Sequence, residues 1–218
     1  MLRAQPRLIR VNLEKLHPTQ ITVGKEEVAL KRKEWGKLSK KVRVATLNQH
    51  WFPSVSGPEG KYYIVDHHHF GLALLQEDVK NVWLLVLKDL YYLDISNFWI
   101  VMDHHQWVHP YDSRGLRREF HVVPTHLEQL QDDPYRSLAG ELRRAGGFAK
   151  DIMPFTEFLW ADFLRKRISS DSVKQNFAKA IAKARKLAHG QDARYLPGWT
   201  GVICTAVNIH SRYRYRAM

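Results

Sequence analysis

The segment Tyr62-Tyr63-Ile64-Val65-Asp66-His67-His68-His69-Phe70-Gly71-Leu72-Ala73 decides the fold, because an apolar strand gives way to a helical run within it. Four polar side chains, at positions 66–69, stand at that junction. In folds that mix strands and helices, such a junction presents the N-terminal amides of a helix to phosphate groups. The sequence therefore predicts a binding site at residues 66–69.

A second cluster of the same composition begins 37 residues later, with Asp103, His104 and His105, and His109 follows it closely. The two clusters hold six of the 12 histidines in the chain. We therefore expect function to be concentrated at these two places. The alternative is structural, because a histidine beside an aspartate at the end of a strand often satisfies buried amides.

Hydrophobic periodicity predicts short strands separated by helices on both sides of the junction. Strands are expected at residues 8–13, 42–47, 62–65 and 82–88, and the continuous apolar run of the last favours a central position. A helix is expected over residues 25–38, with Glu27 and Lys31 paired at i,i+4. These elements predict an α+β core with a small mixed sheet.

After Pro124 the pattern becomes helical. Helices are predicted from Pro134 to Ala145, near residues 155–163, and from Ser172 to His189. We therefore expect a domain over residues 1–120, followed by an all-helical region over residues 121–218.

The formal charge of +12 is unevenly distributed. Residues 1–50 hold 12 Lys and Arg against 4 acids, residues 51–164 hold 10 against 16, and residues 165–218 hold 12 against 2. Basic ends suggest a polyanionic partner such as a nucleotide or nucleic acid, although an ordinary solvated basic surface explains them equally well. On the last predicted helix, Lys179, Lys183 and Lys186 form a stripe that could follow DNA phosphates. The tail over residues 211–216 alternates Arg with Tyr or Ser, a pattern suited to base stacking or to a frayed end.

The single cysteine, Cys204, excludes an internal disulfide and a multi-cysteine zinc site. No run reaches the roughly 18 apolar residues of a membrane span, and the first residues lack a signal-peptide core. The expected location is the cytoplasm, with no membrane partner. The oligomeric state is left open.

The junction resembles the strand-turn-helix signature of the ParB/sulfiredoxin superfamily, in which a motif of the type D-G-H-H-R or G-C-H-R binds nucleotide phosphates. The segment at residues 13–20, which contains Pro18, is similar to the segment that opens ParB-type domains. Most of the chain resembles the subgroup called ParB-like nuclease proteins, through the junction, residues 107–112 and residues 132–137. The resemblance implies the ParB/sulfiredoxin-like α+β fold.

The resemblance also implies roles for particular residues. By similarity to the amino-acid kinases built on this fold, Asp66 and residues 67–69 would face nucleotide phosphates and Mg²⁺. An acid of the first helix, Glu26 or Glu27, would be the base. Polar loop residues would shape the base or ribose pocket, namely Thr19, Gln20, Thr22 and Gly24.

This chain departs from the family motif at three positions. His67 stands where the motif has glycine and is less free to adopt a positive φ. Phe70 replaces an arginine that would bind phosphate bidentately. His68 stands where sulfiredoxin has its catalytic cysteine, which excludes sulfinic acid reduction.

These observations lead to one main hypothesis and two alternatives. The main hypothesis is a nucleotide-binding protein that hydrolyses a nucleoside triphosphate such as ATP, or transfers its phosphoryl group. In it, Asp66 orients Mg²⁺ or phosphate, His68 and His69 donate to phosphates, and Glu27 is the base. The first alternative is a DNA-binding partition-type protein or nuclease, and the second is a metal-dependent phosphoesterase that uses both histidine clusters.

Three further cations are interpreted as ordinary charges on the helical surface. They are Arg136, Arg143 and Lys150. A surface charge is the usual environment of such residues.

Overall fold

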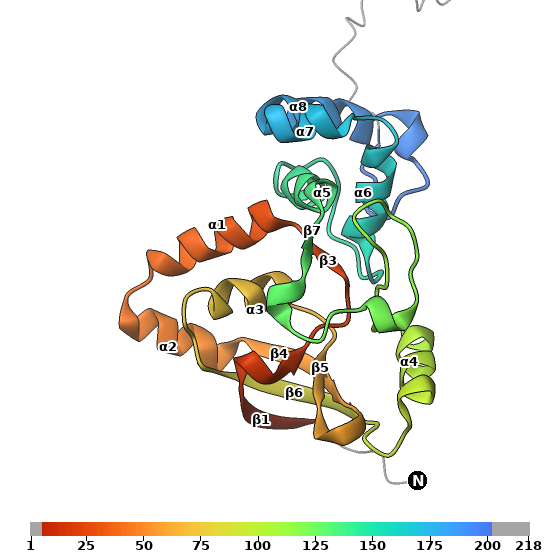
Figure 1. Cartoon of the computed structure of the whole chain (residues 1–218). Helices are drawn as coiled ribbons and strands as arrows, with labels where there is room; N and C mark the ends of the chain where they lie inside the picture. Colours follow the sequence, from red (N-terminus) through yellow and green to blue (C-terminus); the bar gives the residue numbers. More distant parts are fainter. Residues whose placement is uncertain (1–5, 202–218) are drawn as a thin grey trace, which may run out of the picture.

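The computed structural model describes residues 6–201 and places one five-stranded sheet below a set of helices (Figure 1). The strands are β1 (Arg7–Asn12), β2 (Leu16–His17), β3 (Thr22–Val23), β4 (Trp51–Ser56), β5 (Tyr62–Ile64), β6 (Asn81–Asp89) and β7 (Gln131–Asp132). The sheet has the order β1-β6-β4-β5-β2, with antiparallel and parallel pairs, while β3 and β7 form a separate parallel pair. The predicted α+β class with a mixed sheet is confirmed.

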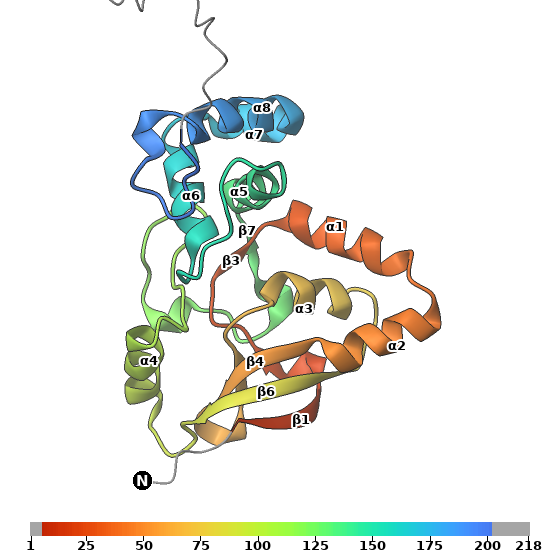
Figure 2. The same ribbon diagram turned by 180° about the vertical axis from the view of Figure 1, so that it is seen from behind.

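The helices cover one side of this sheet and continue above it (Figures 1 and 2). They are α1 (Lys25–Gly36), α2 (Lys40–Gln49), α3 (His68–Leu75), α4 (Ile95–His104), α5 (Pro134–Arg144), α6 (Thr156–Arg165), α7 (Ser170–Gln175) and α8 (Phe177–Ala188). Short 3₁₀ turns lie at residues 13–15, 58–60, 120–122, 127–129 and 191–193. The helix predicted at 172–189 is two helices, because the Asn176 side chain accepts from Lys179 N and starts α8 anew.

The first core lies between the sheet and α3. Alternate residues of the two long inner strands, Phe52, Leu84 and Val86, point inward and are buried. Helix α3 is apolar on nearly all sides, and its Leu72 and Leu74 are buried in the same core. The β5-to-α3 junction is thereby fixed against the sheet.

One predicted strand is wrong. Residues 42–47 belong to helix α2, because Ser39 caps that helix by accepting from Val42 N. The alternating Val42 and Val44 are both exposed, so they are not the inward face of a strand. The strand in this part of the chain is β4, which follows α2. It contains Pro53, and a proline argues against a central strand when a sequence is interpreted alone.

A second core joins α5 to α8, centred on Trp160, Phe163 and Leu138. Gly24 lies against α5 so closely that an added Cβ would come within 2.8 Å of Ser137 Cα. The pairing of β3 with β7 joins the same two parts of the chain. Leu127 and Leu130 pack in the first core, so that core uses residues beyond 120. The division near residue 120 stays a prediction.

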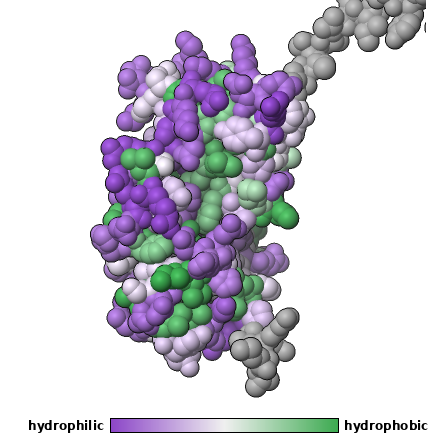
Figure 3. Space-filling model, turned by 90° about the vertical axis from the view of Figure 1, so that its right-hand side faces the viewer, coloured by the Kyte–Doolittle hydropathy of each residue, from purple (hydrophilic) through white to green (hydrophobic). Residues whose placement is uncertain are grey.

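Apolar side chains also gather on the surface near α4, on the lower part of the face in Figure 3. Tyr91, Tyr92, Ile95 and Ile100 are exposed there. Among residues 6–201, no helix is both long and apolar enough to cross a bilayer. Cys204 and the Arg-rich tail at residues 211–216 lie outside the described residues.

Candidate functional site

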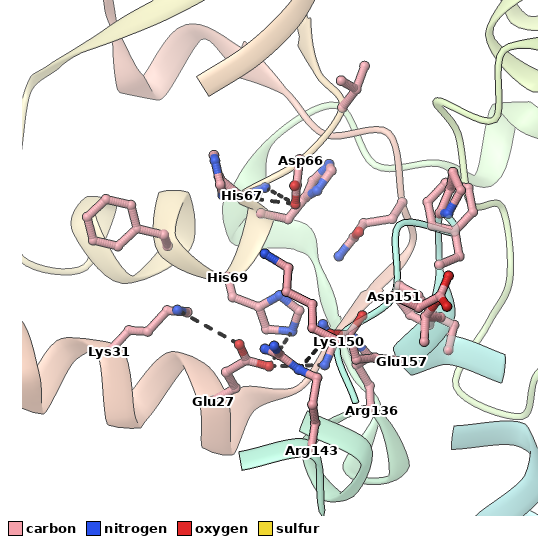
Figure 4. Close-up of a pocket in the computed structure, with 18 of the residues that line it drawn as sticks. Glu27, Lys31, Asp66, His67, His69, Arg136, Arg143, Lys150, Asp151 and Glu157 are labelled. Atoms are coloured by element: carbon pink, nitrogen blue, oxygen red, sulfur yellow. Dashed lines mark hydrogen bonds and ion pairs between the residues drawn. The ribbon is translucent and has the colours of Figure 1, made fainter. Parts of the chain in front are cut away.

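A cavity of about 750 Å³ lies between α1, α3, α5 and the loop that precedes α6. Figure 4 shows its polar residues pointing toward one space from these separate elements. Five carboxylates and four cationic side chains line it: Glu27, Glu34, Asp66, Asp151, Glu157, Lys31, Arg136, Arg143 and Lys150. Its size is within the range of small-molecule sites, roughly 300–1,000 Å³.

The Asp66-His67 turn forms one wall of the cavity. Asp66 Oδ1 accepts from His67 N at 2.6 Å and lies 4.0 Å from His67 Nδ1, and Asp66 lines the cavity. His67 has φ of 66° and caps α3 in the left-handed conformation, so the turn keeps the backbone that glycine would adopt freely. The first helical bond runs from Gly71 N to His67 O, which leaves the amides of residues 68–70 for a ligand.

His68 and His69 have a different role from the predicted one. Each Nε2 accepts from a backbone amide, that of Thr19 at 3.0 Å for His68 and that of Gly24 at 3.0 Å for His69. Burial lowers the pKa of His68 to about 3 and that of His69 well below its usual value, where Arg136 adds to the effect. These nitrogens therefore cannot donate to phosphate, and the two rings fix the segment from Thr19 to Gly24.

The predicted loop residues are buried supports for the site, with one exception. Thr19 Oγ1 donates to Ile64 O, and Thr22 O accepts from Gln20 Nε2 at 2.7 Å. Thr19, Thr22 and Gly24 do not line the cavity, whereas Gln20 does. Gln20 alone of this group is placed to meet a ligand.

Glu27 is the centre of a buried ion-pair network. Its Oε2 accepts from Arg136 Nη1 at 3.0 Å and lies 3.7 Å from His69 Nε2. Its Oε1 lies 3.8 Å from Lys31 Nζ, as the i,i+4 spacing predicts. Both oxygens of the Glu27 carboxylate are thus engaged by cations of the chain, and Glu27 holds Arg136 in place. The role of base for Glu27 stays a prediction.

Arg136 and Arg143 are not ordinary surface charges, contrary to the interpretation of the sequence. Arg136 is 9% exposed, and its Nε is buried without a hydrogen-bond partner among the described residues. Arg143 Nε lies 3.0 Å from Glu157 Oε1, although its N–H is not aligned for a hydrogen bond. Lys150 is exposed, makes no ion pair within residues 6–201, and reaches into the middle of the cavity (Figure 4).

Backbone strain is concentrated at the cavity. Five non-glycine residues of the described chain have positive φ, and three of them line it: His67, Gln106 and Phe155. Left-handed backbone is unfavourable for a bulky residue such as Phe155, which has φ of 59°. Strain of this kind persists where the surrounding structure enforces it, as at binding sites.

The second histidine cluster does not join the first as one set of metal ligands. Asp103 pairs with Arg117 at 2.7 Å, His105 Nε2 lies 3.0 Å from Lys88 Nζ, and His104 is exposed. Within residues 6–201, no three His, Cys, Asp or Glu side chains converge to hold a metal. The phosphoesterase alternative needed the clusters to meet and is not supported.

His109 is the member of the second cluster that approaches the site. It packs at 3.9 Å from the Phe158 ring and lines a smaller adjoining cavity of about 420 Å³. Burial, followed by the nearby charges of Arg136 and Arg165, lowers the pKa of His109 to about 3.

The stripe of Lys179, Lys183 and Lys186 lies exposed on α8 and does not line the cavity. The apolar residues of α8 pack in the second core instead, namely Phe177, Ile181, Ala184 and Ala188.

Sequence reasoning missed the contribution of α5 and the following loop to the site. The one available signal was the resemblance at residues 132–137, which marks the start of α5 without indicating where Arg136 points. Only the packing of α5 against α1 brings Arg136 to Glu27.

Comparison with solved structures gives several matches, among them the following two. The crystal structure of protein Atu1540 from Agrobacterium tumefaciens is 48% identical, covers 91% of this chain and 100% of its own, and superposes with a TM-score of 0.86. The C-terminally truncated chromosome-partitioning protein ParB from Caulobacter crescentus, complexed with CTP-γ-S, is 11% identical and covers 85% of this chain and 94% of its own. Its TM-score is 0.30, too low to support a shared ligand.

No curated protein matches the chain. The model of one protein family, described as "Putative ParB-like nuclease", matches residues 9–166. That match spans the junction, the sheet, α1 and α5. The chain therefore belongs to the family of ParB-like proteins that this model describes.

Proposed function

We propose that the cavity binds a nucleotide together with Mg²⁺, and that the bound nucleotide is hydrolysed or gives up a phosphoryl group. The observation that carries this proposal is the convergence of four cations from α1, α5 and the following loop at the N-terminus of α3. They are Lys31, Arg136, Arg143 and Lys150.

The N-terminus of α3 supports the phosphate end of the proposal. The helix has eight residues, its cap has no side-chain hydrogen bond, and its first amides are free within the described chain. Such amides, with the helix dipole, attract phosphate oxygens. Arg136 adds an unpartnered buried Nε, which a phosphate oxygen would satisfy.

A nucleotide fits the cavity better than free phosphate does. Phe70 and Trp107 are partly exposed aromatic walls, and Gln20 supplies an amide. Aromatic faces of this kind stack on a base. Phosphate alone would leave most of the roughly 750 Å³ unused.

The charge of the lining supports a requirement for a divalent cation. Five carboxylates face four cations, so a bare triphosphate would meet uncompensated negative charge. Asp66 and Asp151 have no Lys or Arg partner within residues 6–201, and one or two carboxylates plus phosphate oxygens are the usual ligands of Mg²⁺. When bound, Mg²⁺ would neutralise phosphate charge and polarise the transferred group.

The residues of the chain would bind and orient the phosphates. Phosphoryl transfer needs little covalent chemistry from a protein beyond positioning and charge stabilisation. Glu27 would hold Arg136 in place, while Arg143 and Lys150 would meet the charge that develops on the terminal phosphate.

Titration calorimetry of ATP, CTP and GTP, with and without Mg²⁺, tests this proposal. We expect saturable binding that requires Mg²⁺ and that weakens by about 10- to 100-fold in Lys150→Ala or Arg143→Ala, since a charge-assisted bond contributes about 1.5–3 kcal/mol. Asp66→Ala is expected to remove the effect of Mg²⁺. The exposed Lys179→Ala is the matched control.

Two results would refute the proposal. One is the absence of binding for every nucleotide, and the other is an unchanged affinity in the Lys150 and Arg143 variants. If binding is found, phosphate release measured on the same variants separates hydrolysis from binding alone.

DNA binding is a second candidate, favoured by one observation. Lys179, Lys183 and Lys186 are exposed on α8 and make no ion pair within residues 6–201. If they contact duplex phosphates, replacing all three with Gln should reduce the slope of log K against log salt by up to about 2.7. Fluorescence anisotropy with a labelled duplex at several salt concentrations measures that slope.

A further inference from the structure

The side of the sheet that faces away from α3 carries apolar side chains. In Figures 1 and 2 the helices lie on the other side of β1, β6 and β4. Since side chains alternate along a strand, the residues between the buried positions of these strands point outward. They are Leu8, Arg10, Trp51, Pro53, Trp83, Leu85 and Leu87, which we call the outer face. Trp51 is 42% exposed, Leu8 is 43% exposed, and the other apolar members are partly exposed.

The pairing register places three members of the outer face in one row. Arg10 of β1 lies opposite Trp83 of β6, and Trp83 lies opposite Trp51 of β4. Directly paired residues project on the same side of a sheet. The row therefore presents one guanidinium beside two indole rings.

Helix α2 fixes the edges of both indoles. Trp51 Nε1 donates to Asn48 O at 2.9 Å, and Trp83 Nε1 donates to Asn48 Oδ1 at 3.3 Å. With the polar edge of each ring satisfied, the ring faces are the surface that remains for a partner.

The charge of the surrounding elements favours an anionic partner. The elements β1, α2, β4 and β6 contain six cations and one acid. The cations are Arg7, Arg10, Lys40, Lys41, Arg43 and Lys88. The acid, Asp89, is already bonded to Arg7 at 3.1 Å and to Ser56 Oγ at 2.6 Å. Arg10, Lys40 and Lys41 are exposed and make no ion pair within the described chain.

We propose that the outer face binds single-stranded nucleic acid, with bases stacked on Trp51 and Trp83 and phosphates held by Arg10 and the basic start of α2. Exposed aromatic faces bordered by cations are the arrangement that binds single strands with little sequence preference. A duplex hides its base faces, so it offers phosphates to the cations but nothing to the indoles. This surface is separate from the cavity, so its partner is independent of any nucleotide bound there.

Fluorescence anisotropy with labelled 12-mers of oligothymidylate and oligouridylate, on the full chain at low salt, tests the proposal. We expect binding that falls with salt and that weakens by about 5- to 150-fold in Trp51→Ala and in Trp83→Ala. Arg10→Gln is expected to weaken binding and to reduce the salt slope by about 0.7. Circular dichroism and thermal unfolding of each variant verify that it is folded, and Tyr195→Ala is the control for an exposed aromatic residue distant in sequence.

Several outcomes would overturn the proposal. They are the absence of binding to either oligonucleotide, equal losses in the Tyr195 and Trp51 variants, and duplex binding as tight as single-strand binding. A loss confined to the Lys179, Lys183 and Lys186 variants would assign the nucleic acid to α8 instead. Binding to vesicles of phosphatidylserine and phosphatidylcholine, or self-association lost in Trp51→Ala, would assign the outer face to a membrane surface or to a second copy.

Discussion

Lowering the pH should destabilise this protein because His68 and His69 are buried in neutral form. In the folded chain their pKa values lie below the unfolded value of about 6.5, and burial is the main cause for both. As the pH falls, the imidazoles of the unfolded chain therefore bind protons before those of the folded chain do. The stability that the neutral buried histidines contribute is fully present above about pH 6.5 and is lost as the pH falls below it. Each pH unit below that value costs about 1.4 kcal/mol per imidazole, so at pH 5 His68 and the buried His109, each with a pKa of about 3, together lower the free energy of unfolding by about 4 kcal/mol, and His69 adds to this loss. That is a large part of a typical stability of about 5–15 kcal/mol.

Urea unfolding at pH 7.5, 6 and 5 measures this effect, and thermal unfolding should show a midpoint lower by about 8–16 °C at pH 5. His69→Gln offers an amide oxygen to Gly24 N without a titrating group, so the part of the pH dependence that belongs to His69 should disappear, while the parts that belong to His68 and His109 remain. The exposed His121→Gln is the control and should leave the dependence unchanged. The reasoning is refuted if the free energy of unfolding changes by less than about 1 kcal/mol between pH 7.5 and pH 5, or if His69→Gln retains the full dependence.

Four further substitutions test the packing that builds the site. Removing one partner of the buried Glu27–Arg136 pair, by Glu27→Gln or Arg136→Met, should lower the free energy of unfolding in urea by about 3–5 kcal/mol. The double variant should lose less than the sum of the two single losses. Additive losses would show that the pair is not coupled. Gly24→Ala should destabilise the protein by about 1–3 kcal/mol, because its Cβ would meet Ser137 backbone atoms; an unchanged thermal midpoint would contradict that contact. Asp133→Ala removes the cap of α5 and one of the two carboxylates that pair with Arg165, the other being Asp162, and should cost about 3 kcal/mol by the same measurement. A cost below about 1 kcal/mol would argue against these roles of Asp133.

Local patterns predicted the elements that rest on local chemistry. The β5-to-α3 junction follows from the change of an apolar strand into an apolar helix, and α5 follows from Asp133 and Pro134 at its start. The strand prediction at residues 42–47 failed because alternation of Val42 and Val44 also fits a helix with exposed valines. Whether they face a core depends on where α2 lies, which no short window of sequence contains.

The sequence by itself determined that residues 66–69 stand at a strand-to-helix junction and that the chain has the α+β class, because both depend on neighbours along the chain. Only the tertiary structure decided what the side chains there do. Three-dimensional packing places the Nε2 atoms of His68 and His69 where they accept hydrogen bonds from the amides of Thr19 and Gly24, more than 40 residues away. It also brought Arg136 to Glu27 across 109 residues and so converted an expected surface charge into a buried donor at the cavity. Burial and long-range ion pairing set the chemistry of a site, and neither is encoded in the spacing of residues along the chain.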